Sequence, residues 1–194
     1  MPVLAPARPG DDVLMGDATD GQGSTTTTAG DEREVLTWDG FGVGSRSLAA
    51  MVADDGFRPD MVLAIARGGL TVAGALSYAL GVKNCFTMNV EYYTGVDQRR
   101  DVPVILPPVL DVVELSGLSV LVADDVADTG HTLELVQRVC AAHVADVRCA
   151  VLYQKPRSVV RCEYVWRETD RWIDFPWSSE APLAGPGAQP ATPR

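Results

Sequence analysis

The stretch Val120-Leu-Val-Ala-Asp-Asp-Val-Ala-Asp-Thr-Gly-His-Thr-Leu133 combines an apolar run, an acidic pair, a third acidic residue and a short turn with one glycine. The apolar part, from Leu118 to Ala123, has the continuous hydrophobicity of a strand that is buried on both faces of a parallel sheet. From Leu133 to Ala142 the apolar residues recur at helical spacing. We therefore expect an α/β fold in which residues 124–132 form a turn from a strand to a helix.

This turn has the composition of a sugar-phosphate site. Ligands of open α/β sheets lie beyond the carboxyl ends of the strands, where a starting helix offers free N–H groups and a positive dipole end. Gly130 allows a close backbone approach, and Thr129 and Thr132 supply hydroxyl donors for phosphate oxygens. Asp124 and Asp125 suit the vicinal hydroxyls of a sugar, because carboxylates accept hydrogen bonds from both. The plainer alternative is that the acidic residues only cap the helix that follows.

The ordered run of apolar strand, acidic pair, Asp-Thr-Gly and second Thr resembles the signature of type I phosphoribosyltransferases, which binds 5-phosphoribosyl-1-pyrophosphate (PRPP). The resemblance implies that Asp124 and Asp125 hold the ribose, in part through Mg²⁺, and that Asp128, Thr129, Gly130, His131 and Thr132 form the 5′-phosphate loop. It also makes Asp128 the candidate catalytic residue, which would take a proton from N7 of a purine. His131 stands where several relatives have Lys, so we expect its backbone amide to bind the phosphate.

A second strand, turn and helix precede the signature. Met61–Ala66 has the pattern of a buried strand, Arg67-Gly68-Gly69 follows, and a helix is expected from Leu70 to Leu80, ended by Gly81. Paired glycines leave amides free to approach an anion, and Arg67 adds a donor fork, although a close-packed turn has the same composition. By resemblance Arg67, Gly68 and Gly69 are the pyrophosphate loop, with a cis peptide at Ala66–Arg67.

The segment after this helix is expected to hold a strand and then a loop. Val82–Tyr93 has a strand pattern, residues 94–103 are polar and rich in turn formers, and residues 104–106 return to an extended pattern. The resemblance makes the polar segment a flexible catalytic loop, for which Tyr92, Tyr93, Arg99 and Arg100 are available. The sequence lacks the Ser-Tyr pair of several purine-using relatives here, and an exposed hairpin tip is the alternative.

The C-terminal third is expected to form a small hood over the base site. After a strand at residues 146–153, Lys155 and the Trp172-Ile173 pair, followed by Pro176-Trp177, are similar to xanthine-guanine phosphoribosyltransferase-like sequences. By that resemblance Lys155 donates to a purine 6-oxo group, Trp172 stacks on the ring, and the Ile173 carbonyl meets a C2 substituent. The alternatives are a solvated lysine and tryptophans that only cover the sheet edge. For Trp38 we expect a place in the core in preference to a lid over the base.

The composition is that of one globular domain of 194 residues, with 46% hydrophobic and 22% charged residues. We expect a disordered tail over residues 1–31, a phosphoribosyltransferase domain over 32–178 with its hood at about 154–178, and a flexible tail over 179–194. Four scattered cysteines, without zinc-like spacing, are read as reduced core thiols. No apolar run reaches the length of a membrane span, so a cytoplasmic location is expected.

The function implied by the resemblance is purine salvage. The enzyme would transfer 5-phosphoribosyl from PRPP to N9 of guanine, xanthine or hypoxanthine, with Mg²⁺ as cofactor, and would act as a homodimer or homotetramer. The alternatives are a regulatory protein that senses PRPP or nucleotides on the same fold, and a phosphoribosyltransferase with a non-purine acceptor. The formal net charge of -10 makes a nucleic-acid partner unlikely.

Overall fold

The computed structural model describes residues 33–95, 98–106 and 115–184, with the backbone alone for 91–95 and 98–106. The expected tail over residues 1–31 lies outside the described residues, as does the greater part of the expected C-terminal tail.

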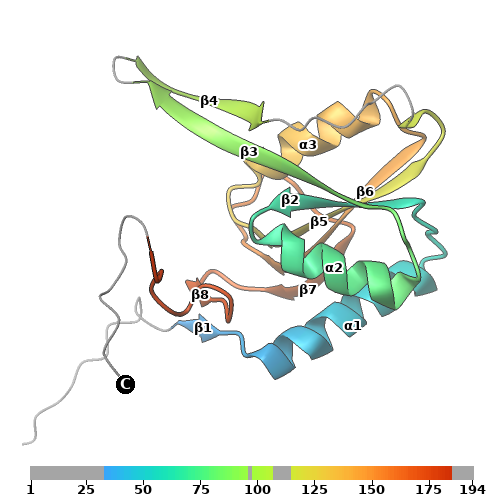
Figure 1. The fold of residues 1–194 in the computed structure, drawn as a ribbon, viewed down its shortest axis with the longest axis horizontal. Helices are drawn as coiled ribbons and strands as arrows, with labels where there is room; N and C mark the ends of the chain where they lie inside the picture. Colours follow the sequence, from blue (N-terminus) through green and yellow to red (C-terminus); the bar gives the residue numbers. More distant parts are fainter. Residues whose placement is uncertain (1–32, 96–97, 107–114, 185–194) are drawn as a thin grey trace, which may run out of the picture. The chain divides into compact units, whose positions relative to one another are not determined.

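A six-stranded sheet forms the centre of the fold, in the order β4-β3-β2-β5-β6-β7 (Figure 1). Five of its strands are parallel, and β4 is antiparallel to β3. A second, two-stranded parallel sheet joins β1 to β8. The strand bounds are β1 Glu34–Val35, β2 Met61–Ala66, β3 Cys85–Gly95, β4 Gln98–Leu106, β5 Ser119–Ala127, β6 Asp146–Gln154, β7 Tyr164–Glu168 and β8 Ile173–Asp174.

Helices cover both faces of the sheet, which confirms the expected fold class. The helices α1 (Trp38–Asp54) and α2 (Gly69–Leu80) lie on one face, and α3 (His131–Ala141) lies on the other (Figure 1). Alternate residues of β2 point to the two faces: Val62 and Ala64 pack in the core with α1 and α2, whereas Leu63 and Ile65 pack with α3. Burial of both faces explains the continuous apolar runs in the sequence.

Helix α1 includes three glycines near its start, Gly40, Gly42 and Gly44, although glycine is a poor helix former. The structure starts the helix at Trp38, where the Thr37 hydroxyl caps it by accepting a hydrogen bond from the Gly40 amide at 3.1 Å. Gly44 is required by packing, since a Cβ there would lie 2.9 Å from the Trp166 ring.

Strand β5 and the β3–β4 hairpin differ from the expected boundaries. β5 continues to Ala127, so the acidic pair lies on the strand and not in the turn, which shortens to residues 128–130. The polar segment 94–103, expected as a loop, is largely strand, because β3 and β4 pair from Asn89–Leu106 to Gly95–Gln98. Backbone pairing between β3 and β4 therefore extends the strands into a segment whose composition favours turns.

Two expectations about the core were wrong. Cys85 is exposed, whereas Cys140 and Cys149 are buried and Cys162 is half-buried, and all four are free thiols. Trp38 is 57% exposed, and its ring lies 6.0 Å from the rings of both Phe41 and Trp177. It therefore covers the edge of an aromatic cluster instead of filling the core.

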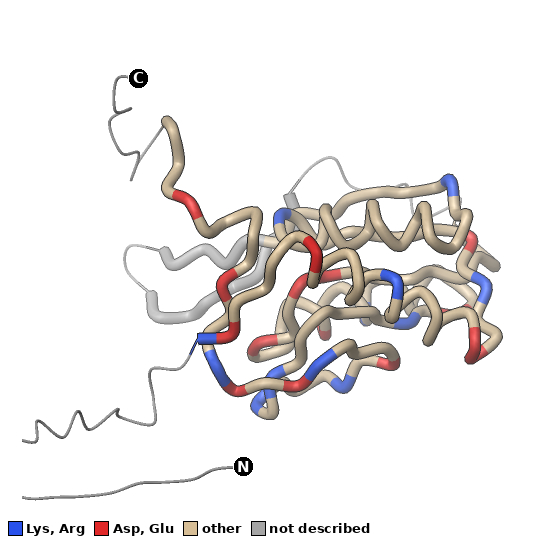
Figure 2. Tube along the Cα trace, turned by 90° about the horizontal axis from the view of Figure 1, so that it is seen from below, with Lys and Arg blue, Asp and Glu red and all other residues tan. Residues whose placement is uncertain are grey.

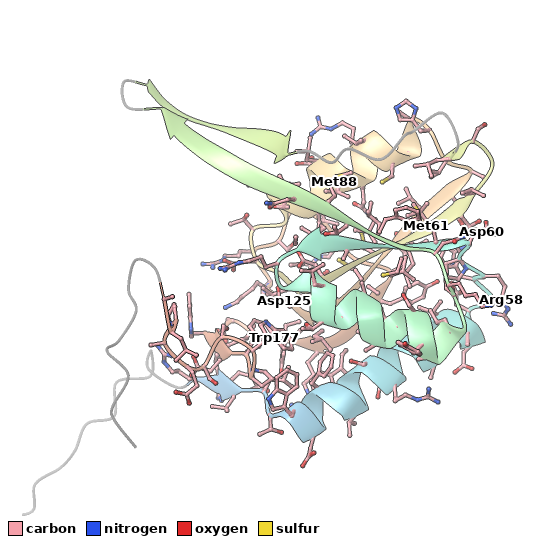
Figure 3. All side chains as sticks on the ribbon, viewed as in Figure 1. Arg58, Asp60, Met61, Met88, Asp125 and Trp177 are labelled. Atoms are coloured by element: carbon pink, nitrogen blue, oxygen red, sulfur yellow. The ribbon has the colours of Figure 1, made fainter. Side chains whose placement is uncertain are left out.

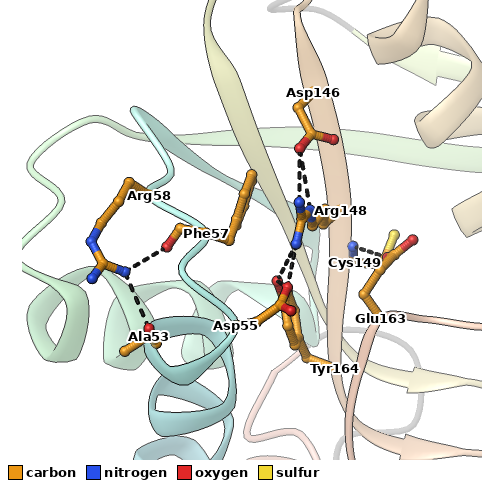
Figure 4. A network of polar contacts seen from close by, with 9 residues as sticks. All are labelled: Ala53, Asp55, Phe57, Arg58, Asp146, Arg148, Cys149, Glu163 and Tyr164. Carbon is orange, nitrogen blue, oxygen red and sulfur yellow. Dashed lines mark hydrogen bonds and ion pairs between the residues drawn. The ribbon is translucent and has the colours of Figure 1, made fainter.

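A polar network ties α1 to the far strands of the sheet (Figure 4). The Arg148 guanidinium of β6 forms ion pairs with Asp55, just after α1, and with Asp146, and it lies 4.4 Å over the Phe57 ring. It also donates to the Tyr164 hydroxyl of β7 at 3.0 Å. These contacts lie near the start of β6. They therefore stabilise the sheet at the end opposite the carboxyl ends of its strands.

Charges of both signs are interspersed along the described chain. Figure 2 shows Lys and Arg interspersed with Asp and Glu along the described chain. Within the described residues, no helix has the length and apolar character needed to cross a membrane.

Candidate active site

The site lies at the carboxyl ends of β2 and β5. These strands are neighbours, but the chain continues from β2 to β3 on one side and from β5 to β6 on the other. The connections therefore diverge between β2 and β5, which is the topological switch point where open α/β sheets bind ligands.

The acidic pair lies near the end of β5, and both side chains are half-buried. Burial, together with the neighbouring Asp125 charge, raises the pKa of Asp124 well above its ordinary value. Burial also raises the pKa of Asp125, against hydrogen bonds from the Val126 amide, its own amide and the Trp177 indole, which lower it. Two carboxyl groups in this environment favour a bound cation or hydroxyl donors, as the ribose and metal assignment requires.

The turn after β5 has the geometry expected of a phosphate cup. Gly130 has a φ of 82°, in the left-handed region that favours glycine, and α3 begins at the next residue. No side chain caps this helix, so its first amides can receive an anion. Thr129 and His131 are exposed, Thr132 is half-buried, and the His131 ring lies 3.7 Å from Glu134.

The turn after β2 packs directly against the acidic pair. A Cβ added to Gly68 would lie 2.7 Å from Asp125 Oδ1 and nearer still to Oδ2, and one added to Gly69 would lie 3.2 Å from Asp124 Oδ1. The expected cis peptide at Ala66–Arg67 is present, and the Arg67 side chain is exposed. The predicted pyrophosphate loop is therefore in contact with the acidic pair, although about sixty residues separate them in the sequence.

A cavity of about 240 Å³ brings the predicted catalytic and base-binding residues together. It is lined by Val126, Asp128, Lys155, Trp172, Ile173, Asp174, Phe175 and Ser178. Trp172 is 66% exposed, so its ring is accessible to a planar ligand, whereas Ile173 is buried.

Lys155 is buried, which excludes the solvated alternative. Its backbone N–H donates to Ala127 at 2.9 Å, and its Nζ donates to the carbonyls of Asp170 and Arg171. An ammonium has three N–H donors, so one can serve a ligand in the cavity.

The carbonyl of Ile173 points away from β1. In the parallel β1–β8 pair, the Glu34 amide donates to the Trp172 carbonyl at 2.8 Å, and the Leu36 amide donates to the Asp174 carbonyl at 3.0 Å. Because carbonyls alternate in direction along a strand, that of Ile173 faces the opposite side. It is thus available to a ligand, as the sequence reasoning required.

Several residues of the site were missed by the sequence reasoning. Arg157 donates two hydrogen bonds to Oδ1 of Asp128, one of them from Nε at 3.0 Å, and this pairing of an exposed arginine across 29 residues leaves no local pattern. Strand β1 pairs with β8 and thereby holds the hood. The ion pair between Arg33, just before β1, and Asp174 of β8 adds to this contact at 2.6 Å.

The chain matches known proteins over most of its length. The family model for the phosphoribosyl transferase domain matches residues 32–182. The chain belongs to the phosphoribosyl transferase domain family. It is 34% identical over 154 residues to a xanthine-guanine phosphoribosyltransferase of Ruegeria sp. (strain TM1040), a match that covers 73% of this chain and 83% of the relative. It is 35% identical over 153 residues to the xanthine-guanine phosphoribosyltransferase of Roseobacter denitrificans, with the same coverage.

A solved structure has the same fold as this phosphoribosyltransferase. The crystal structure of a purine phosphoribosyltransferase from Pyrococcus horikoshii superposes with a TM-score of 0.69 at 33% identity. The match covers 79% of this chain and 99% of that one.

The remaining residues predicted for the site of this phosphoribosyltransferase belong to the β3–β4 hairpin. Tyr92 and Tyr93 belong to β3, and Arg99 and Arg100 belong to β4. Their side chains lie outside the described part of the chain, so their role over the pyrophosphate stays a prediction.

Proposed function

We propose that the protein transfers the 5-phosphoribosyl group from PRPP to N9 of a 6-oxopurine, namely guanine, xanthine or hypoxanthine, with release of pyrophosphate. The observation that carries this proposal is the single cavity shared by Asp128, Lys155, Trp172 and Ile173, next to the 5′-phosphate turn. The purine-using relatives at about one-third identity support the same substrate class.

PRPP is proposed to bind across the two loops at the switch point. The amides from Thr129 to Thr132, with both threonine hydroxyls, hold the 5′-phosphate at the start of α3. Asp124 and Asp125 accept hydrogen bonds from the ribose hydroxyls, and the amides around Arg67, Gly68 and Gly69 hold the pyrophosphate and its growing charge.

The acidic pair also fits a magnesium site. Mg²⁺ prefers carboxylate oxygens and substrate phosphates, and burial raises the pKa values of both Asp124 and Asp125, which a bound cation would offset. When bound with PRPP, Mg²⁺ would supply neutralisation of the leaving group. Within the described residues no group of three or more His, Cys, Asp or Glu side chains could hold a metal ion, so most ligands of Mg²⁺ would be PRPP oxygens and water.

The base is proposed to bind in the cavity with its ring against Trp172. Lys155 donates its remaining N–H to the 6-oxo group, and the Ile173 carbonyl meets the C2 side of the purine. Asp128 receives the N7 proton at Oδ2, because Arg157 occupies Oδ1. Proton transfer to a positioned base of this kind contributes about 10²- to 10⁴-fold to the rate.

Nucleotide formation from PRPP and Mg²⁺ tests the proposal, with guanine, hypoxanthine, xanthine, adenine, uracil and orotate offered separately. We expect turnover with 6-oxopurines alone. Asp128→Asn should lower kcat by roughly 10²-fold or more while the KM for PRPP stays within a few-fold.

PRPP binding without product from any base would overturn the proposal in favour of a sensor on this fold. Product from uracil or orotate would instead move the acceptor to a non-purine. An unchanged kcat in Asp128→Asn would remove this residue from the mechanism. We further expect a cytoplasmic homodimer or homotetramer, from the resemblance alone.

A further inference from the structure

The segments that follow β5 and β6 lie at the same end of the sheet. These strands are parallel neighbours, so residues 128–130 and residues 155–160 both follow the carboxyl end of a strand. Figure 3 shows Asp125 at this end of the sheet and Asp60, just before β2, at the other. Residues 155–160 therefore border the candidate active site.

The backbone of this segment fixes the chain on both sides of Asp128. The Lys155 N–H donates to the carbonyl of Ala127, and the Val159 N–H donates to the carbonyl of Thr129, both at 2.9 Å. The residues before and after Asp128 are thus held by two hydrogen bonds from the same segment. What stays to be set at Asp128 is the direction of its side chain.

The side chain of Arg157 sets that direction. Its Nε donates to Oδ1 of Asp128 at 3.0 Å, and its Nη2 donates to the same oxygen. A guanidinium is planar and rigid, so two of its N–H groups on one oxygen define where the carboxylate lies. An oxygen has two lone pairs for hydrogen bonds, so Oδ2 is the oxygen that can accept a further proton. Because the Arg157 side chain is 64% exposed, the pair adds little to stability, and its main effect is on orientation.

We propose that Arg157 is a positioning residue for the general base, which holds the Asp128 carboxylate so that Oδ2 faces N7 of the bound purine. This inference rests on the proposed role of Asp128. Lys155, proposed to bind the 6-oxo group, lies two residues before Arg157 in the same segment. N7 and the 6-oxo group lie on the same edge of a purine. One segment therefore supplies the donor to the base and aligns the proton acceptor beside it.

The test compares Arg157→Ala with a matched loss of charge in the same part of the chain. We expect Arg157→Ala to lower kcat about tenfold, less than the factor on the order of 10² that a 1 Å misplacement can cost, because the carboxylate itself remains. The KM values for PRPP and the 6-oxopurine should stay within about twofold of the wild type, since Arg157 is proposed to touch neither substrate. Arg161→Ala is the control. Arg161 is likewise exposed, and it pairs with Glu168 at 3.9 Å, so its loss should leave kcat and both KM values unchanged.

A double-mutant cycle with Asp128→Asn separates this inference from the proposed function. If Arg157 acts through Asp128, Arg157→Ala should have no further effect on kcat once the carboxylate is replaced. An unchanged kcat in Asp128→Asn alone would refute the general-base assignment, and the inference with it. A lowered kcat in Asp128→Asn, with a normal kcat in Arg157→Ala, would refute the inference alone. Multiplicative effects of the two changes, or a raised KM for either substrate with a normal kcat in Arg157→Ala, would also refute it.

Discussion

Gly68→Ala is the substitution with the most specific expected effect on the site. The glycine has a φ of −57° and a ψ of −41°, a conformation that alanine adopts without strain. Its effect therefore comes only from the added methyl group, which would meet the Asp125 carboxylate.

The size of the effect follows from this contact. The nearest carboxylate oxygen would have to retreat by about 1 Å to reach 3.0 Å, a limit that real Cβ contacts respect. Displacement of a substrate-positioning group by 1 Å costs on the order of 10²-fold in rate. We therefore expect kcat/KM for PRPP to fall by roughly 10²-fold, together with a loss of stability of about 1–3 kcal/mol from overpacking.

Steady-state kinetics with PRPP varied at saturating 6-oxopurine, together with thermal melting, measures both effects. Gly74→Ala is the matched control, because it lies in the same helix α2 and its Cβ would meet nothing within 4 Å. That control should keep full activity and gain about 0.5–1 kcal/mol of stability. Normal PRPP kinetics in a folded Gly68→Ala variant would refute the contact between the pyrophosphate loop and the acidic pair.

Three further substitutions test separate parts of the structure. Asp124→Asn should raise the melting temperature of the ligand-free protein at neutral pH, by roughly 2–4 °C per kcal/mol regained. The raised pKa of Asp124 means that the native state binds this proton more tightly than the unfolded state, so the stability of the wild type falls as pH rises above about 3.8. The stability advantage of Asp124→Asn should therefore vanish near that pH. Melting curves recorded without PRPP and Mg²⁺ at several pH values check this. Lys155→Gln should raise the KM for a 6-oxopurine roughly tenfold with little change for PRPP, and an equal rise in the KM for PRPP would contradict its role. Gly44→Ala, whose Cβ would lie 2.9 Å from the Trp166 ring, should cost about 1–3 kcal/mol in denaturant unfolding, against no loss for Gly42→Ala, which meets nothing within 4 Å.

Local chemistry was enough to predict a strand and the glycine positions around the proposed phosphate half of the site. Met61–Ala66 was predicted as a strand with its observed bounds, since a strand buried on both faces leaves an uninterrupted apolar run. Gly81 and Gly130 both have positive φ values and lie at helix boundaries, as their positions in the sequence indicated.

The base-binding residues were predicted from the family resemblance. The contacts that support their proposed roles are visible only in the structure. Nothing local to Lys155 predicts that it is buried, because its partners are the carbonyls of Asp170 and Arg171, fifteen and sixteen residues away. The same holds for the Arg157–Asp128 ion pair and for the pairing of β1 with β8.

The sequence alone determined which strands lead into glycine turns and acidic residues, and hence which short segments are proposed to carry the chemistry. This is possible because the backbone of a turn and the burial of a strand depend on nearby residues. Only the tertiary structure decided that Gly68 lies against Asp125, that Lys155 is buried, and that Trp38 covers the surface instead of the core. These contacts join residues that are distant in the chain, and they exist only because the sheet order and the packing of α1, α2 and the hood bring them together.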